Sequence, residues 1–196
     1  TTGRRESLMM RETEIRPQVL IDAYVDLAAV DAIRYFPEDD RYAFPCPACG
    51  SAGEFCFAKQ TWRYERCPEC LTIFVAPRAD RQCFQRYYQE SASARFFGTT
   101  FYPQTAEARR ERLWRPRAQW LRDLRDAALV RPMTLVDIGG GYGLLAEEYR
   151  KIADDHILVI EPNPALATVC RERGTDVVQS FLEDLKPTQL PGGSRL

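Results

Sequence analysis

The pattern of apolar and polar positions in the last third of the chain predicts alternating strands and helices. Short apolar runs have the length of buried strands, and helical periodicity fills the intervals between them. The predicted strands are 134–138, 157–160 and 176–178, and the predicted helices are 144–152 and 165–173. A β-α-β-α-β order is normally solved by a parallel sheet with right-handed crossovers. We therefore predict an α/β fold in this part of the chain.

The pattern before this region predicts helices around a cysteine-bearing segment. Apolar residues recur at helical spacing from Pro17 to Phe36, and a longer helical pattern covers 105–128, where Pro116 should kink or split the helix. We divide the chain into a mobile N-terminus at 1–16, a packing helix and linker at 17–44, a cysteine-bearing segment at 45–77, an aromatic and Arg-rich helical segment at 78–130, and the α/β domain at 131–196.

Composition and charge narrow the class of protein. The 196 residues are 45% hydrophobic and 28% charged, which is typical of a soluble globular protein, and the formal net charge is −1. No apolar stretch approaches the roughly 20 residues of a membrane-spanning helix, and the N-terminus lacks the apolar core of a signal peptide. We therefore expect a soluble cytoplasmic protein with no membrane partner.

Two segments allow more than one interpretation. The arginines between Arg109 and Arg125 form either an ion-paired, solvated helix face or a patch for nucleic acid, and the near-neutral charge favours the first. The aromatic residues between Phe84 and Tyr102 form either a lid or acceptor pocket, or plain packing.

Two Cys-x-x-Cys pairs predict a metal site. Cys46 and Cys49 form the first pair, Cys67 and Cys70 form the second, and residues 50–66 separate them. This spacing is typical of a four-cysteine zinc ribbon, in which each pair supplies two thiolates to one tetrahedral ion. Because four cysteines close the coordination shell, we expect a structural zinc ion. The alternative of a redox dithiol fits one such pair better than two.

The remaining cysteines and one neighbouring residue add little chemistry. Cys56, Cys83 and Cys170 lie outside both pairs, and we interpret them as small packing residues. Leu71 follows the second pair at a position where glycine is common.

A glycine-rich segment follows the first predicted strand of the α/β domain. Asp137 ends the apolar run, and Gly139, Gly140, Gly141 and Gly143 surround Tyr142. Residues 141–146 satisfy the G-x-G-x-x-A fingerprint of dinucleotide-binding proteins, which alone is a weak signal. A carboxylate at this position would repel a pyrophosphate and attract a cation. Tight packing of strand against helix is the alternative explanation of the glycines.

These residues resemble the motifs of class I S-adenosylmethionine-dependent methyltransferases. Val136–Gly143 is similar to their first motif, and Glu161 resembles the acidic residue after their second strand, which binds the ribose hydroxyls. The segment 181–184 resembles the part after their third strand whose acidic residue meets the adenine amine. The order of helix, four-cysteine ribbon, aromatic segment and Arg-rich helix is similar to bacterial methyltransferases with an N-terminal zinc-binding domain, several of which act on sugars or other small metabolites.

The resemblance implies a partial doubly wound, Rossmann-like sheet, an S-adenosylmethionine cofactor and a small-molecule methyl acceptor. It implies cofactor contacts from Asp137, Gly139, Gly140, Gly141, Tyr142, Gly143, Glu161, Pro162 and Asn163, and from one of Glu183 and Asp184. The catalytic residue stays unassigned. His156, the only histidine, precedes its predicted strand, whereas ligands of an open α/β sheet bind beyond the carboxyl ends of the strands.

The α/β domain is short. Only residues 134–196 are available for it, whereas a doubly wound domain needs on the order of 100 residues or more. We therefore expect a C-terminally truncated methyltransferase with weak or no turnover by itself, and an open sheet edge that permits self-association. The competing interpretation is a zinc-ribbon nucleic-acid-binding protein or RNA methyltransferase, and an NAD-linked oxidoreductase ranks third.

Overall fold

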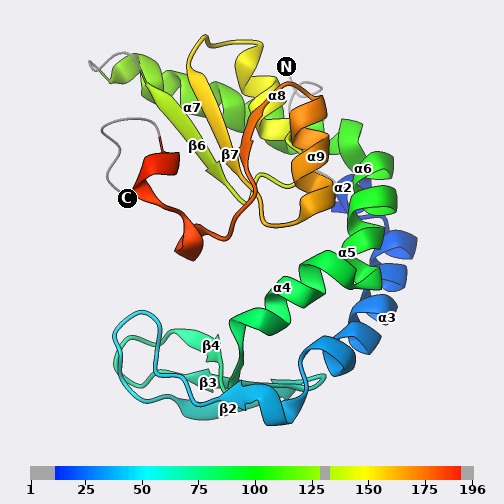
Figure 1. The fold of residues 1–196 in the computed structure, drawn as a ribbon, viewed down its shortest axis with the longest axis vertical. Helices are drawn as coiled ribbons and strands as arrows, with labels where there is room; N and C mark the ends of the chain where they lie inside the picture. Colours follow the sequence, from blue (N-terminus) through cyan, green and yellow to red (C-terminus); the bar gives the residue numbers. More distant parts are fainter. Residues whose placement is uncertain (1–11, 129–132, 191–196) are drawn as a thin grey trace, which may run out of the picture. The chain divides into compact units, whose positions relative to one another are not determined.

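The computed structural model describes residues 12–128 and 133–190, and the chain divides into two compact units (Figure 1). The first unit comprises Thr1–Asp22 and Arg95–Leu196, and we call it the α/β unit. The second comprises Ala23–Ala94, and we call it the ribbon unit. The division places the aromatic and Arg-rich segment in both units, because 78–94 falls in the ribbon unit and the helices after it fall in the α/β unit.

The α/β unit is built on a three-stranded parallel sheet in the order β6-β7-β8. The strands are β6 (Thr134–Ile138), β7 (His156–Ile160) and β8 (Asp176–Val178), and the helices that connect them are α8 (Leu144–Arg150) and α9 (Pro164–Glu172). Asn163 caps α9, because its side chain accepts hydrogen bonds from the backbone N–H groups of Ala165 and Leu166. The prediction of a mixed α/β fold with a parallel sheet is confirmed.

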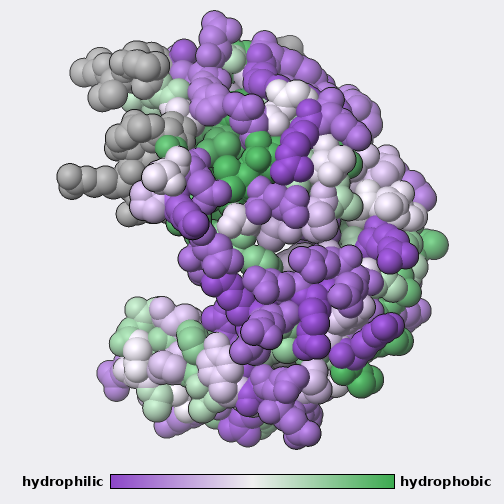
Figure 2. Space-filling view, viewed as in Figure 1, coloured by the Kyte–Doolittle hydropathy of each residue, from purple (hydrophilic) through white to green (hydrophobic). Residues whose placement is uncertain are grey.

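The two faces of this sheet are covered differently. On one face, Ile157 and Val159 of β7 pack against small and aromatic residues of the helices, including Ala146, Tyr149 and Cys170. On the other face, Leu158 and Ile160 pack against the segment that ends at Leu190. That cover is incomplete, since Ile138 at the end of β6 is 51% exposed. Figure 2 shows the apolar surface of this region bordered by hydrophilic residues.

Several helical segments precede the sheet in the α/β unit. They are α2 (Glu12–Ile15), the π-helical η2 (Phe97–Phe101), α6 (Tyr102–Arg109), the π-helical η3 (Arg110–Trp114) and α7 (Arg115–Ala127). Pro116 lies in the first turn of α7, where its missing N–H is tolerated, and the π-helical η3 directly precedes this helix. The expected mobile N-terminus covers 1–16, of which 1–11 lie outside the described residues; Ile15 in α2 is buried.

The ribbon unit combines helices with two small antiparallel sheets. Helix α3 (Gln18–Tyr35) leads into it, and β2 (Glu54–Lys59), β3 (Trp62–Arg66) and β4 (Ile73–Val75) form one sheet in that order. The second sheet pairs β1 (Arg41–Tyr42) with β5 (Arg78–Ala79), and α4 (Arg81–Glu90) and α5 (Ala92–Phe96) follow. Short 3-10 turns complete the described elements at η1 (Glu38–Asp40), η4 (Leu182–Asp184) and η5 (Pro187–Gln189).

No helix within residues 12–128 and 133–190 combines the length and the apolar character that are needed to cross a bilayer.

Candidate functional site

The four cysteines of the two pairs converge in the ribbon unit. Their sulfur atoms all lie within 4.8 Å of one another. The Sγ atoms of Cys46 and Cys70 are 3.5 Å apart, and those of Cys49 and Cys67 are 3.4 Å apart. Four sulfurs at about 2.3 Å from a central zinc ion would lie about 3.8 Å from one another in a regular tetrahedron. All four thiols are free, so the cluster could hold a zinc ion with little movement.

The two pairs sit in turns of the same kind. The N–H of Cys46 donates to the carbonyl of Ser51, and the N–H of Cys67 donates equivalently to Thr72. Gly50 follows the first pair with φ of 79°, and Leu71 takes its place after the second pair with φ of 63°. Leu71 therefore adopts a backbone conformation that suits glycine, and its side chain is 59% exposed.

Hydrogen bonding favours the thiolate form of Cys70, one of the four clustered cysteines. The Sγ of Cys70 lies 3.2 Å from the Oγ1 of Thr72, and this side chain together with the backbone of Thr72 lowers the pKa of Cys70 to about 6. A metal ligand must be deprotonated, so this environment suits coordination. Among the cysteines outside the pairs, Cys56 is exposed on β2, and Cys83 and Cys170 are buried.

The glycine loop lies at the carboxyl ends of β6 and β7 in the α/β unit. Ile138 and Ile160 are paired at the ends of the two strands, and the N–H of Gly139 donates to the carbonyl of Ile160 over 2.7 Å. Gly139 has φ of 72°, and a Cβ there would meet nothing within 4 Å, so the backbone at this point is open to a ligand. A Cβ at Gly140 would lie 2.7 Å from Cγ1 of Val159, so packing alone requires that glycine.

The carboxylate of Glu161 is hydrogen-bonded to the glycine loop. It follows β7 directly and is 4% exposed. One carboxylate oxygen accepts a hydrogen bond from the N–H of Gly141 over 2.8 Å, and the other accepts from the N–H of Asn163 over 2.9 Å. Each oxygen keeps a second lone pair. The residue predicted to meet ribose therefore already orders the glycine loop in the free chain.

Asp137 is a second acid at the same edge of the sheet. It is partly buried, and its carboxylate makes no hydrogen bond or ion pair among the residues that the structure describes. Burial raises its pKa. Burial also raises the pKa of Glu161, against the opposing effect of the two N–H donors, and the charge of Asp137 adds to the rise. Two carboxylates therefore lie near the loop, and no cation of the described residues forms an ion pair with either of them.

Tyr102 packs against the glycine loop, which agrees with the lid alternative for the end of the aromatic run. Its ring stacks on that of Tyr142, with centroids 5.3 Å apart and planes at 4°. Its hydroxyl would lie 3.0 Å from a Cβ at Gly141. Tyr102 stands at the start of α6, far from the loop in sequence, so only the aromatic run and Pro103 marked this segment.

The Arg-rich segment is mostly ion-paired. Arg110 donates to Glu147 and Glu148 of α8, over 3.2 and 3.3 Å, and Arg115 lies 3.0 Å from Glu148. Arg112, Arg122 and Arg125 pair with Glu14, Asp126 and Asp155, among others. These pairs agree with the interpretation of a helix face with ion pairs. Arg109 differs from them, because it is buried without an acidic partner in the described part of the chain.

The remaining predicted site residues lie in different places. Asn163 and Pro162 follow Glu161 at the start of α9, beside the loop. Glu183 and Asp184 are exposed in η4, so the structure leaves both on the surface. His156 begins β7, at the opposite end of the strand from Glu161, and its Nε2 lies 2.8 Å from Oδ2 of Asp176.

The ribbon unit contains an aromatic cavity of about 450 Å³. Residues from α4 and the ribbon strands share its lining, which includes Phe36, Trp62, Tyr64, Phe74, Phe84 and Tyr87. The aromatic run of the sequence is thus divided, since Phe84 and Tyr87 line this cavity and Tyr102 covers the glycine loop.

Comparison of the chain with protein-family models and with curated proteins gives no match.

Proposed function

We propose that this chain binds S-adenosylmethionine in the α/β unit and acts as a methyltransferase on a small molecule, with a structural zinc ion in the ribbon unit. One observation carries the proposal. A glycine loop at the carboxyl ends of two adjacent parallel strands lies beside the buried carboxylate of Glu161 and the partly buried carboxylate of Asp137, and Asp137 has no partner among the described residues.

The charge of the site supports a cationic ligand. A pyrophosphate beside Asp137 and Glu161 would meet two like charges at close range, whereas a sulfonium and an ammonium group would be attracted. The strand order β6-β7-β8 supports a Rossmann-like assignment, because one half of such a sheet has its first three strands in this consecutive order. The open backbone at Gly139 supports close approach of a ligand.

The residues have separate tasks under this proposal. Glu161 orders the loop and offers its remaining lone pairs to ribose hydroxyls, and Asp137 attracts the positive groups. Tyr102 and Tyr142 form a stacked wall that excludes water. The bound cofactor would supply an electrophilic methyl group, which passes to the acceptor by in-line displacement. A general base stays unassigned, as does the contact of Glu183 or Asp184 with adenine.

Calorimetric titration of the chain with S-adenosylmethionine tests the proposal. We expect Asp137→Asn to weaken binding by ~10-fold or more, since it removes a charge and keeps the shape of the side chain. Asp154→Asn is the matched control, because Asp154 is exposed in the turn before β7 and should not affect affinity. Equal affinity of the wild type and Asp137→Asn would contradict the assignment of Asp137.

The alternative of a nucleic-acid-binding protein makes a different prediction. Salt-sensitive RNA binding that is lost on substitution of Arg109 and Arg110 would favour it. The ion pairs of Arg110 with three glutamates weaken this alternative, because those charges are already compensated within the α/β unit.

A further inference from the structure

The α/β unit buries the guanidinium of Arg109, which has no acidic partner among the residues that the structure describes. Arg109, the last residue of α6, is 8% exposed, and its Nε makes no hydrogen bond. Within residues 12–128 and 133–190 its guanidinium has no acidic partner, and the permanently charged side chain that acts on it is Arg16, of the same sign. Burial lowers the pKa of Arg109, Tyr102 acts in the opposite direction, and Arg16 adds a smaller lowering. An unpaired buried charge is costly, so a site of this kind points to an anionic ligand.

Arg109 is connected to the glycine loop through Tyr102. The guanidinium carbon lies 5.3 Å from the ring centroid of Tyr102 and 5.1 Å from that of Phe101. The Tyr102 ring also contacts the loop, through its stack on Tyr142 and the position of its hydroxyl beside Gly141.

The pKa of Tyr102 also depends on the charged groups near it. Burial raises the pKa of Tyr102, Arg109 acts in the opposite direction, and Glu161 and Asp137 raise it. A positive group and two negative groups therefore surround one side chain at the edge of the loop. This arrangement complements a zwitterion, with an anionic group toward Arg109 and a cationic group toward the carboxylates.

We propose that Arg109 binds the carboxylate at the amino-acid end of S-adenosylmethionine, an inference that rests on the proposed function. Asp137 and Glu161 then serve the positively charged groups of the same ligand. The buried guanidinium gains a charge-assisted hydrogen bond when the ligand is present.

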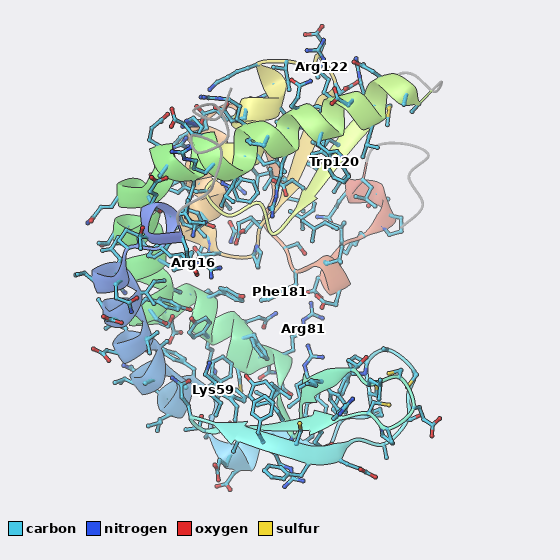
Figure 3. The ribbon with its side chains drawn as sticks, turned by 180° about the vertical axis from the view of Figure 1, so that it is seen from behind. Arg16, Lys59, Arg81, Trp120, Arg122 and Phe181 are labelled. Atoms are coloured by element: carbon cyan, nitrogen blue, oxygen red, sulfur yellow. The ribbon has the colours of Figure 1, made fainter. Side chains whose placement is uncertain are left out.

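Two nucleosides that differ only in this end of the molecule provide the test. S-Adenosylhomocysteine carries the amino-acid group, and 5′-methylthioadenosine lacks it. We expect Arg109→Gln to weaken binding of S-adenosylhomocysteine by ~10- to 100-fold in calorimetric titrations and to leave that of 5′-methylthioadenosine unchanged. Arg122→Gln is the control for loss of an arginine, because Arg122 lies on the exposed face of α7 and pairs with Asp126 over 3.5 Å (Figure 3).

Thermal unfolding of the free variants separates binding from folding. We expect Arg109→Gln to unfold at the same temperature as the wild type or higher, because it removes an unpaired buried charge. A lower unfolding temperature together with equal loss of both nucleosides would show a structural role and overturn the inference. Wild-type binding of both nucleosides with equal affinity would overturn it and leave the proposed function standing, whereas binding of neither would overturn both.

Discussion

At the residue scale, folding and ligand binding favour different protonation states of Asp137 and Glu161. Both pKa values are higher in the folded chain than in the unfolded chain, because burial disfavours the charged form. The folded state thus binds more protons, so their contribution to stability falls as pH rises from the unfolded pKa values near 4 through the raised folded values. A cationic ligand needs the charged form, so affinity rises over the same range.

Stability and affinity for S-adenosylmethionine should therefore change in opposite directions with pH. Between about pH 4 and the raised folded pKa values, the wild type should lose stability relative to Asp137→Asn as pH rises, while its affinity for S-adenosylmethionine increases relative to that of the variant. Urea denaturation and calorimetric titration at matched pH values measure the two differences. Parallel curves for the two proteins, in either measurement, would contradict the account of Asp137.

Leu71 provides a second prediction at this scale, in the ribbon unit. Its φ of 63° is costly for a side chain with a Cβ, so Leu71→Gly should stabilise the metal-loaded protein by about 1 kcal/mol. Leu71→Ala shortens the exposed side chain and keeps the strain, so it should give no gain. Denaturant unfolding compares the three proteins, and equal stability of the glycine and alanine variants would show that the backbone at this turn is unstrained.

At the element scale, the sequence predicts regular segments well and long-range contacts poorly. The apolar runs of β6 and β8 match the predicted strands residue for residue, because turn residues bound each of them. The four cysteines were predicted to meet because metal geometry constrains their spacing. The stack of Tyr102 on Tyr142 and the burial of Arg109 were not predicted, because tertiary packing decides them and no local pattern records it.

The cysteine cluster of the ribbon unit predicts which substitutions remove the zinc ion. Cys67→Ser should lose the zinc ion, because one of four ligands is replaced by a neutral hydroxyl, and elemental analysis should show about one zinc per chain in the wild type but not in this variant. Cys56→Ser is the control, since Cys56 is exposed on β2 outside the cluster. Full zinc content in Cys67→Ser, or its loss in Cys56→Ser, would contradict the assigned ligand set.

At the scale of the whole molecule, each unit has a core of its own. The α/β unit packs around β7, with Val159 and Ile160 fully buried, and the ribbon unit packs around Phe36 and the cysteine cluster. Stability of the two cores should therefore depend on different ligands, zinc for one and the proposed nucleoside for the other.

Removal of the metal tests this division. After treatment with a chelator, amide hydrogen exchange should increase in the strands of the ribbon, β2, β3 and β4, and stay slow in β6 and β7. Mass spectrometry of peptides reads both regions in one sample, and restored zinc should reverse the change. Equal loss of protection in both units would show that they fold as one.

We propose above that Asp137, the glycine loop and Glu161 form a site for S-adenosylmethionine. The most direct test is calorimetric titration of the 196-residue chain with S-adenosylmethionine, followed by addition of NADH to the same sample. We expect one S-adenosylmethionine to bind per chain and NADH not to displace it. Absence of binding up to about 1 mM, or displacement by NADH at equal concentration, would contradict it.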